Sequence, residues 1–184
     1  MSRIKELLAE LCPDGVEYKL LKNVAAYASQ RISLPNVDIT SDNYISVDNM
    51  LPKCQGVKEA NYLPDKGSAI AFNKGDILIG NIRPYLKKVW LAEFSGGTNG
   101  DVLVIQIHDR KQLNPRYLYY VLSADVFFYY DMKYAKGAKM PRGDKTAVMR
   151  YELPVPPIEV QREIVRILDN FTELTAELTA ELTA

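Results

Sequence analysis

The last part of the chain, from Ile158 to Ala184, contains neither proline nor glycine and directly follows a proline-rich segment. Its apolar residues recur at alternating intervals of four and three, the pattern of a coiled-coil seam. As one helix this segment would extend about 40 Å, and a narrow apolar stripe of that length cannot bury its far end on a small body. The pattern therefore predicts a long helix that needs a partner helix. The stripe comprises Val160, Ile164, Ile167, Phe171, Leu174, Leu178 and Leu182.

The same segment ends in a repeat, in which Glu-Leu-Thr-Ala is written three times from Glu173 to Ala184. The repeat holds no nucleophile with a neighbouring base and no cluster of metal ligands, so it is not a catalytic site. A repeated unit inside a helix sets a length, and we interpret it as a spacer. A helix that folds back onto the chain's own core remains the alternative.

The formal net charge of zero conceals two oppositely charged regions. Residues 132–150 carry six basic side chains against the single acid Asp144, whereas residues 152–184 carry seven acids against Arg162 and Arg166. A basic body segment beside an acidic tail permits nucleic-acid binding without requiring it.

Composition narrows the class of protein further. Apolar residues make up 47% of the chain and charged residues 25%, which fits a folded domain with a substantial core. No apolar run approaches the ~20 residues of a membrane span, and the start of the chain lacks a signal-peptide layout. We therefore expect a cytoplasmic protein with no membrane partner. Cys12 and Cys54 are too few for a disulfide framework or a metal site, and we expect reduced thiols.

Local patterns predict a mixed α+β fold with two parts. We expect a body over residues 1–153, opened by a helix at about residues 2–12, and a separate helix over residues 154–184. Short runs rich in β-branched and aromatic residues, bounded by Gly, Asn, Asp or Pro, predict strands. These runs are Asn43–Val47, Ser68–Phe72, Asp76–Gly80, Lys88–Ala92 and Asp101–Ile107. Asn114–Tyr130 predicts a helix with Pro115 in its first turn, and the prolines of Glu152–Pro157 predict an extended segment.

Enzymatic signatures are weak. Asp14, Glu17 and Lys19 offer the acid–acid–lysine set of some nucleases, but the two acids share one short turn instead of lying on separate strands. His108, the one histidine, has no second histidine or paired cysteine to work with. Asn114–Tyr117 resembles the Asn-Pro-Pro-Tyr motif of adenine methylases in outline, yet Arg116 replaces the second proline. We expect no catalytic site and no cofactor in this chain.

Two segments have the composition of a DNA-binding surface. Gly80–Lys88 places Asn, Arg, Tyr and two lysines after an apolar strand, and Lys133–Lys145 places five cations and two glycines in one loop. Arginine and asparagine can bond base edges in the major groove, whereas lysine suits phosphates. An ordinary solvated turn and a solvated basic loop are the alternatives. Our candidates for the DNA face are Arg83, Lys87, Lys88, Lys133, Lys136, Lys139, Arg142 and Lys145, with Asn81, Tyr85 and Asn99 as further candidates for base or backbone contacts.

Two runs resemble the DNA-specificity subunits of type I restriction–modification systems. Gly75–Ile79, followed by Arg83–Lys87 and Gly97–Ile105, is similar to the core of the family's target recognition domain. Leu153–Val165, continuing to Leu168-Asp169, matches the run that opens the family's spacer helix. Repeats of Thr-Ala-Glu-Leu are a spacer feature in some members.

This resemblance implies a non-catalytic protein that reads one half of a split double-stranded DNA target. It implies a recognition domain with a twisted, partly barrel-like sheet plus helices, followed by a coiled-coil helix. A methyltransferase subunit using S-adenosylmethionine would modify adenine, and a restriction subunit would join the full complex. Whole members have two recognition domains and two spacer helices, so we interpret this chain as a half-subunit that forms a homodimer.

Two other functions stay open. The chain could be a coiled-coil adaptor without DNA recognition, which predicts negligible affinity for duplex DNA. It could also be a stand-alone nuclease, which predicts metal-dependent cleavage that is lost when Asp14 or Glu17 is changed.

Overall fold

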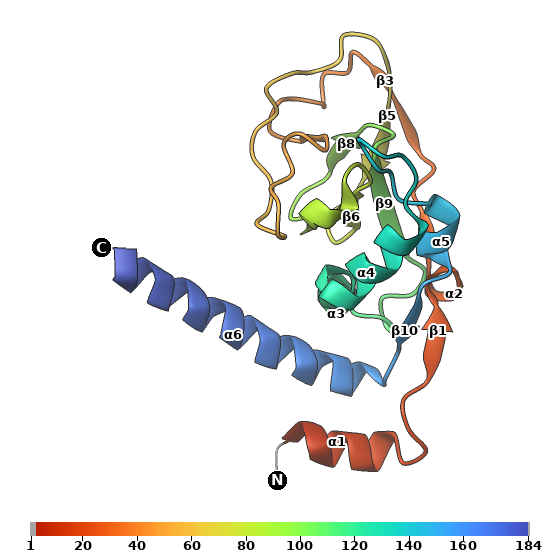
Figure 1. Cartoon of the computed structure of the whole chain (residues 1–184), viewed down its shortest axis with the longest axis vertical. Coiled ribbons are helices and arrows are strands. Elements are labelled where there is room, and N and C mark those ends of the chain that lie inside the picture. Colours follow the sequence, from red (N-terminus) through yellow and green to blue (C-terminus); the bar gives the residue numbers. More distant parts are fainter. Residues whose placement is uncertain (1–2, 184) are drawn as a thin grey trace.

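The computed structural model describes the backbone of residues 3–183 and the side chains of residues 3–181, so Ser2, Ala184 and the Leu182 side chain lie outside it. A mixed α/β body carries a long helix, α6, which runs away from the body toward the C-terminus (Figure 1). The helices are α1 Arg3–Leu11, α2 Leu21–Val24, η1 Pro84–Leu86, α3 Pro115–Ser123, α4 Asp125–Tyr134, α5 Lys145–Met149 and α6 Ile158–Thr183. The strands are β1 Tyr18–Leu20, β2 Ala25–Tyr27, β3 Arg31–Leu34, β4 Tyr44–Ile45, β5 Gly67–Phe72, β6 Ile77–Gly80, β7 Val89–Leu91, β8 Gly96–Thr98, β9 Val102–Ile107 and β10 Glu152–Pro154.

The centre of the body is an antiparallel sheet in the order β2-β9-β6-β7. Successive side chains of a strand point to opposite faces, and both faces of this sheet are covered. Ile77 and Ile79 enter the core that the sheet forms with α3 and α4, whereas Leu78 enters a second core on the other face. The continuous apolar run of β6 is explained by burial on both sides.

A second four-stranded sheet, in the order β3-β5-β8-β4, covers that other face. Phe72 of β5 meets Trp90 of β7 edge to face across the second core, with ring centroids 6.0 Å apart. Strand β4 pairs in parallel with β8, where a Cβ on Gly96 would lie 2.0 Å from the Asn43 carbonyl oxygen. Glycine is therefore required at that crossing. The two sheets are open and separate, so the barrel-like sheet expected above is not formed by the described residues.

The aromatic segment after β9 forms two helices instead of the single predicted helix. The Asn114 side chain caps α3 by accepting bonds from the backbone N–H groups of Arg116 (2.8 Å) and Tyr117 (3.2 Å), as a helix start requires. Ala124 then adopts an extended conformation with ψ of 147°, which ends α3 and starts α4. The break turns α4 so that Phe127 and Phe128 enter the core under η1 and α5.

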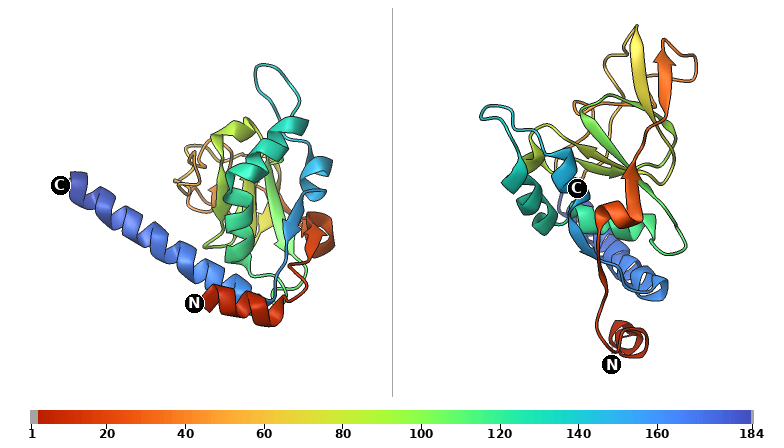
Figure 2. Two further views of the ribbon diagram at one scale, coloured as in Figure 1. Left: turned by 60° about the horizontal axis from the view of Figure 1, so that its bottom comes forward. Right: turned by 90° about the vertical axis from the view of Figure 1, so that its right-hand side faces the viewer.

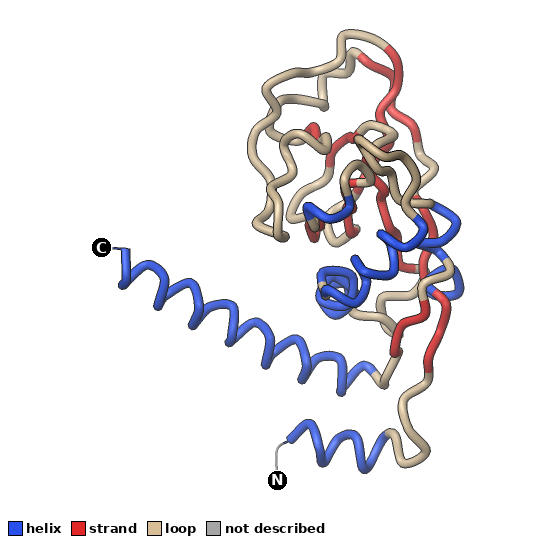
Figure 3. Tube along the Cα trace, in the orientation of Figure 1, coloured by secondary structure: helices blue, strands red, loops and turns tan. Residues whose placement is uncertain are grey.

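The two ends of the body meet in a small ribbon, in which β1 pairs antiparallel with β10. The prolines after β10 then lead the chain into α6. Helix α1 lies beside the beginning of α6 (Figures 1 and 2). The long segment between β4 and β5 is irregular (Figure 3). No helix of the described residues is long and apolar enough to cross a membrane.

Candidate nucleic-acid interface

Three segments far apart in the sequence are joined by backbone hydrogen bonds at one end of the body. The Asn81 N–H donates to the Asp101 carbonyl (2.8 Å), and the Gly143 N–H donates to the Asn81 carbonyl (3.1 Å). The Arg83 N–H donates to the Pro141 carbonyl (2.7 Å). The two candidate segments of the sequence, together with the turn between β8 and β9, therefore form one surface. We call the exposed side chains of residues 81–88, 99–101 and 136–145 the basic face.

Arg83 and Lys87 flank the short helix η1, and both have left-handed backbone conformations with φ of 53° and 52°. This region is uncommon for side-chain-bearing residues, and here neighbouring hydrogen bonds hold it in place. Lys53 and Cys54 also have left-handed backbone conformations. Their N–H groups donate to the carbonyls of Leu86 and Lys87, both at 2.9 Å. The loop is therefore fixed in shape, and it presents an exposed Arg83 and a half-exposed Tyr85.

Lys87 and Lys88 have protein partners. Lys87 pairs with Asp125 of α4, and that hydrogen bond raises the pKa of the lysine. Lys88 Nζ donates to the Val47 carbonyl at 2.6 Å, and partial burial lowers the pKa of this lysine. In this structure both side chains bond protein groups next to the loop, whereas the sequence led us to expect them to contact DNA phosphates.

The basic loop is a narrow hairpin, because Lys136 and Arg142 exchange two backbone hydrogen bonds of 2.9 and 2.8 Å. Four cations of this hairpin and its end are exposed, namely Lys136, Lys139, Arg142 and Lys145, and Lys139 lies between the two paired positions. Arg142 Nε lies 3.4 Å from Asp101 Oδ1, which ties the hairpin to the neighbouring turn. Lys145 Nζ donates to the Gly100 carbonyl at 3.4 Å.

The acid in this loop, Asp144, has a structural role. Its carboxylate caps α5 by accepting from the N–H groups of Thr146 (2.9 Å) and Ala147 (3.0 Å). These bonds, with Lys136 Nζ at 3.2 Å, lower the pKa of Asp144. The Asp144 carboxylate therefore marks the end of the loop at the start of α5, and Lys139 and Arg142 stay exposed to solvent.

The remaining candidates for DNA contacts are Lys133, Asn99 and Asn81. Lys133 is exposed on α4, 5.8 Å from the centre of the Tyr134 ring, and Asn99 builds its own turn by accepting from the Asp101 N–H at 3.1 Å. Asn81 is only 5% exposed, so the expectation that it is presented to a base edge is corrected by the structure. Asn81 directly follows β6, and its backbone bonds both the Asp101 turn and Gly143 of the basic loop.

A residue that the sequence patterns did not indicate, Asp131 of α4, lies beside Gly143 as Asn81 does. Asp131 is 1% exposed, and its Oδ1 and the Asn81 Oδ1 are both buried without a hydrogen-bond partner among the described residues. Burial, followed by the charge of Asp144, raises the pKa of Asp131 to about 6. An acid inside an apolar-aromatic helix gives no periodic signal, and only its contacts show its position.

The apolar stripe of α6 is divided between the body and solvent. Val160 is fully buried in the body, and Ile164 packs against the same core, so these two residues are not available to a partner helix as expected. Phe171, Leu174 and Leu178 are 63%, 55% and 59% exposed. The alternative that this helix folds back on its own core therefore holds for its first turns alone.

Gln161 fastens those first turns to the body. Its side chain is completely buried, and Nε2 donates to the carbonyls of Gln112 (2.8 Å) and Pro156 (2.7 Å). Its Oε1 accepts from the Asn114 N–H at 2.8 Å. The amide thus links α6 to the start of α3, and the glutamine that follows the proline run has a defined structural purpose.

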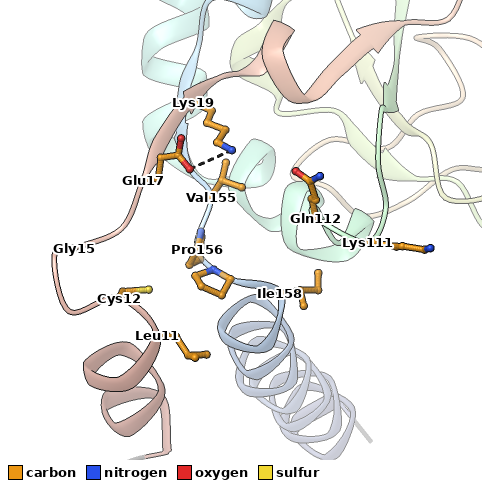
Figure 4. A pocket seen from close by; sticks show the side chains of 11 residues that line it. Leu11, Cys12, Gly15, Glu17, Lys19, Lys111, Gln112, Val155, Pro156 and Ile158 are labelled. Carbon is orange, nitrogen blue, oxygen red and sulfur yellow. Dashed lines mark ion pairs between the residues drawn. The ribbon is translucent and has the colours of Figure 1, made fainter.

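The residues of the nuclease alternative lie at the other side of the molecule. Glu17 pairs with Lys19 at 3.2 Å on the wall of a hollow of about 430 Å³ between the end of α1 and the start of α6 (Figure 4). Within the described residues, no group of three or more His, Cys, Asp or Glu side chains could hold a metal ion.

Comparison with known proteins decides the family. The model of the type I restriction modification DNA specificity domain matches residues 13–184. The chain belongs to the type I restriction–modification DNA specificity family. A putative type I restriction enzyme specificity subunit of Haemophilus influenzae is 37% identical over 70 residues, which are 38% of this chain and 17% of that protein.

Solved specificity subunits share this fold. The HsdS subunit of Thermoanaerobacter tengcongensis superposes with a TM-score of 0.72 at 20% identity, over 90% of this chain and 44% of that one. The type I S subunit of M. genitalium gives a TM-score of 0.61 at 16% identity, over 90% of this chain and 41% of that one. This specificity-family chain therefore spans less than half the length of the subunits it matches.

Proposed function

We propose that the chain is a DNA-reading half of a type I specificity subunit, in which the basic face contacts one half of a split target. The observation that carries the proposal is the convergence of residues 81–88, 99–101 and 136–145 at one end of the body, with Arg83, Lys139 and Arg142 exposed. The acids next to this face include Asp101 and Asp125, which pair with Arg142 and Lys87, and Asp144, which accepts from helix N–H groups. The face is therefore positively charged and held in a fixed shape.

The chemistry of the face divides its side chains into two roles. Arginine can bond guanine O6 and N7 together, so Arg83 and Arg142 are the proposed base readers. Lys139 and Lys136 are the proposed phosphate contacts, which give affinity and register without sequence information. Lys133 on α4 extends the phosphate contacts beyond the loop.

The proposed assembly is a homodimer through the outer part of α6. A chain that covers 44% of one specificity subunit and 41% of another fits the role of one of two equivalent halves. The exposed Phe171, Leu174 and Leu178 supply an apolar stripe for an antiparallel copy. Two-fold pairing would present two identical basic faces, so the target would be a palindrome interrupted by a gap.

In this proposal the chain does no chemistry itself. A methyltransferase subunit binds the pair and modifies adenine with S-adenosylmethionine, and a restriction subunit joins the complete complex. The Glu-Leu-Thr-Ala repeats set the distance between the two faces, because four residues lengthen a helix by about 6 Å and rotate it by a net angle of roughly 40°. One base pair turns B-DNA by a similar angle of about 35°. The added 6 Å exceeds the ~3.4 Å rise of one base pair, so the match is partial and bending of the DNA or the helix must absorb the difference.

Selection of binding sites from random duplex DNA tests the proposal. The purified chain with its methyltransferase subunit should enrich two inverted half-sites separated by a fixed number of unspecified base pairs. Enrichment of a single uninterrupted site, or of no site, would contradict the split-target proposal.

A further inference from the structure

Two buried oxygen atoms without a hydrogen-bond donor lie next to Gly143, beneath the basic face. A Cβ atom placed on Gly143 would lie 2.6 Å from Asn81 Oδ1, 2.7 Å from Asp131 Oδ1 and 3.1 Å from Asp131 Oδ2. Both residues are more than nine-tenths buried, and neither Oδ1 has a hydrogen-bond partner among the described residues. Both oxygens therefore lie around the same small space beneath Gly143, and a hydrogen atom shared between them would satisfy both buried acceptors.

These atoms lie where the basic face is assembled. The Asn81 backbone bonds the Asp101 turn through its N–H and the basic loop through its carbonyl, which accepts from Gly143. The Asn81 side chain therefore sets the position of a residue that connects all three segments. Only a glycine leaves room for the two oxygens under the loop.

We propose that Asp131 is a positioning residue, whose protonated carboxyl donates to Asn81 Oδ1 and thereby holds the three segments of the basic face together. With the Asn81 amide as it stands, a protonated Asp131 carboxyl satisfies both oxygens with a single hydrogen bond, whereas an ionised carboxylate would need the amide turned so that Nδ2 donates to it. The two arrangements have opposite pH dependence, because only the first is lost when Asp131 ionises. The other titratable groups around it are Asp144 at the start of α5, Tyr27 of β2 and Tyr130 of α4, with Lys136 bonded to Asp144. None of these groups is a cation that pairs with the Asp131 carboxyl, so its surroundings favour the neutral acid.

The direction of the pH effect follows from the raised pKa. Since the pKa of Asp131 rises from 3.8 to about 6 in the folded chain, the closed junction is most stable below about pH 4. It loses stability as the pH increases toward about 6 and stays constant above that value. A shift of about two units corresponds to a change of roughly 100-fold in the opening equilibrium.

Amide hydrogen exchange measures this opening without DNA. The Gly143 N–H, bonded to the Asn81 carbonyl at 3.1 Å, reports the junction, and the Ala28 N–H, bonded to the Val104 carbonyl at 2.9 Å, reports the central sheet. After correction for intrinsic exchange, protection of Gly143 should decrease by up to about 100-fold between pH 4 and pH 6.5, while protection of Ala28 changes far less. Equal pH dependence at the two amides would overturn the proposal.

Two variants separate positioning from a general packing role. Asp131→Asn keeps a side-chain donor for Asn81 Oδ1 at every pH, so protection of Gly143 should remain high and lose its pH dependence. Asp131→Ala removes the donor, so protection should be low throughout. The proposal is wrong if Asp131→Asn retains the pH dependence of the wild-type chain, or if both variants lower protection equally.

A DNA-binding measurement connects the junction to the function, and this step alone rests on the proposed function. At pH 5, where the Asp131 carboxyl is mostly protonated, Asp131→Asn should bind target duplex about as tightly as the wild-type chain, and Asp131→Ala about tenfold more weakly. If the wild-type chain binds no duplex, the proposed function fails, while the exchange result still decides the role of Asp131.

Discussion

Asp169 on α6 accepts a hydrogen bond from Arg116 Nε on α3 at 2.7 Å, and the Tyr120 hydroxyl donates to the same carboxylate oxygen. This pair lies where α6 leaves the body, because the stripe residues that follow it are more than half exposed. Half of the Arg116 side chain is exposed, so the ion pair itself contributes little to stability. Together with the Tyr120 bond, it links the middle of α6 to α3.

The first prediction concerns the buried amide that fastens α6. Gln161→Ala should lower the free energy of unfolding by about 2–3 kcal/mol, since three backbone groups lose their buried partner at once. Gln112→Ala is the matched control, because its side chain is exposed and only its carbonyl takes part. Chemical denaturation of both variants checks the difference, and equal stabilities would show that the amide network adds nothing.

The second prediction concerns the charges of the basic face. If Lys139 and Arg142 each contact a phosphate or a base, replacing either by alanine should weaken duplex binding. For a side chain on a phosphate, the slope of log affinity against log salt should decrease by about 1. Lys111→Ala, beside the hollow near the start of α6, serves as the control (Figure 4). A salt titration followed by fluorescence anisotropy gives both slopes, and an unchanged slope for Lys139→Ala would remove that residue from the contact surface.

The third prediction concerns the exposed stripe. Leu174→Glu combined with Leu178→Glu should weaken self-association at least tenfold and leave monomer stability nearly unchanged, because both side chains are more than half exposed. Glu173→Ala, adjacent in sequence but off the stripe, should have no comparable effect. Sedimentation equilibrium measures the association constant. Identical constants for all three proteins would show that α6 does not pair through this stripe.

The fourth prediction concerns the repeat. Inserting one further Glu-Leu-Thr-Ala unit between Ala176 and Glu177, which keeps the repeat in register, should lengthen α6 by about 6 Å and turn it by roughly 40°. The gap in the selected DNA site should then increase by about one or two base pairs, because the added rotation matches about one base-pair step and the added length nearly two rises of ~3.4 Å, while both half-sites stay the same. Leu178→Ile keeps the length and should keep the gap. An altered half-site with an unchanged gap would contradict the spacer role.

The fifth prediction uses two glycines of the basic face. Gly143→Ala should weaken DNA binding and lower stability by about 1–3 kcal/mol, because the new methyl group would lie within 2.7 Å of two buried oxygens. Gly100→Ala should change stability by less than about 0.5 kcal/mol, since nothing lies within 4 Å of its Cβ position. Thermal unfolding and anisotropy on both variants check the contrast.

Much of the fold was predictable because its signals are local. Strands β4 to β7 and β9 lie within or overlap the predicted runs, and α6 begins directly after Pro157 as expected. Strands β1, β2, β3 and β8 were not predicted, because each has only three or four residues and pairs with a strand distant in sequence, such as β10 or β9. The break at Ala124 also has no local signal, because packing of the aromatic residues on both sides decides it.

The candidate site was predictable only as two separate segments. Composition indicates Arg83 and the cations of residues 133–145 as candidates. That these two segments form one surface depends on hydrogen bonds between residues about 60 positions apart, such as the bond from Arg83 to Pro141. The same distant contacts bury Asn81, pair Lys87 with Asp125 and direct Lys88 to Val47. Sequence types alone do not distinguish a free cation from a bonded one.

The central claim is that this chain supplies the DNA specificity of a methyltransferase complex through its basic face. The most direct test is to map modified adenines across a genome when the methyltransferase subunit is produced with the wild-type chain or with an Arg83→Ala, Lys139→Ala, Arg142→Ala variant. We expect modification at one interrupted palindrome with the wild-type chain and its loss with the variant. The same pattern of modified adenines with both proteins, or with the methyltransferase subunit alone, would contradict the claim.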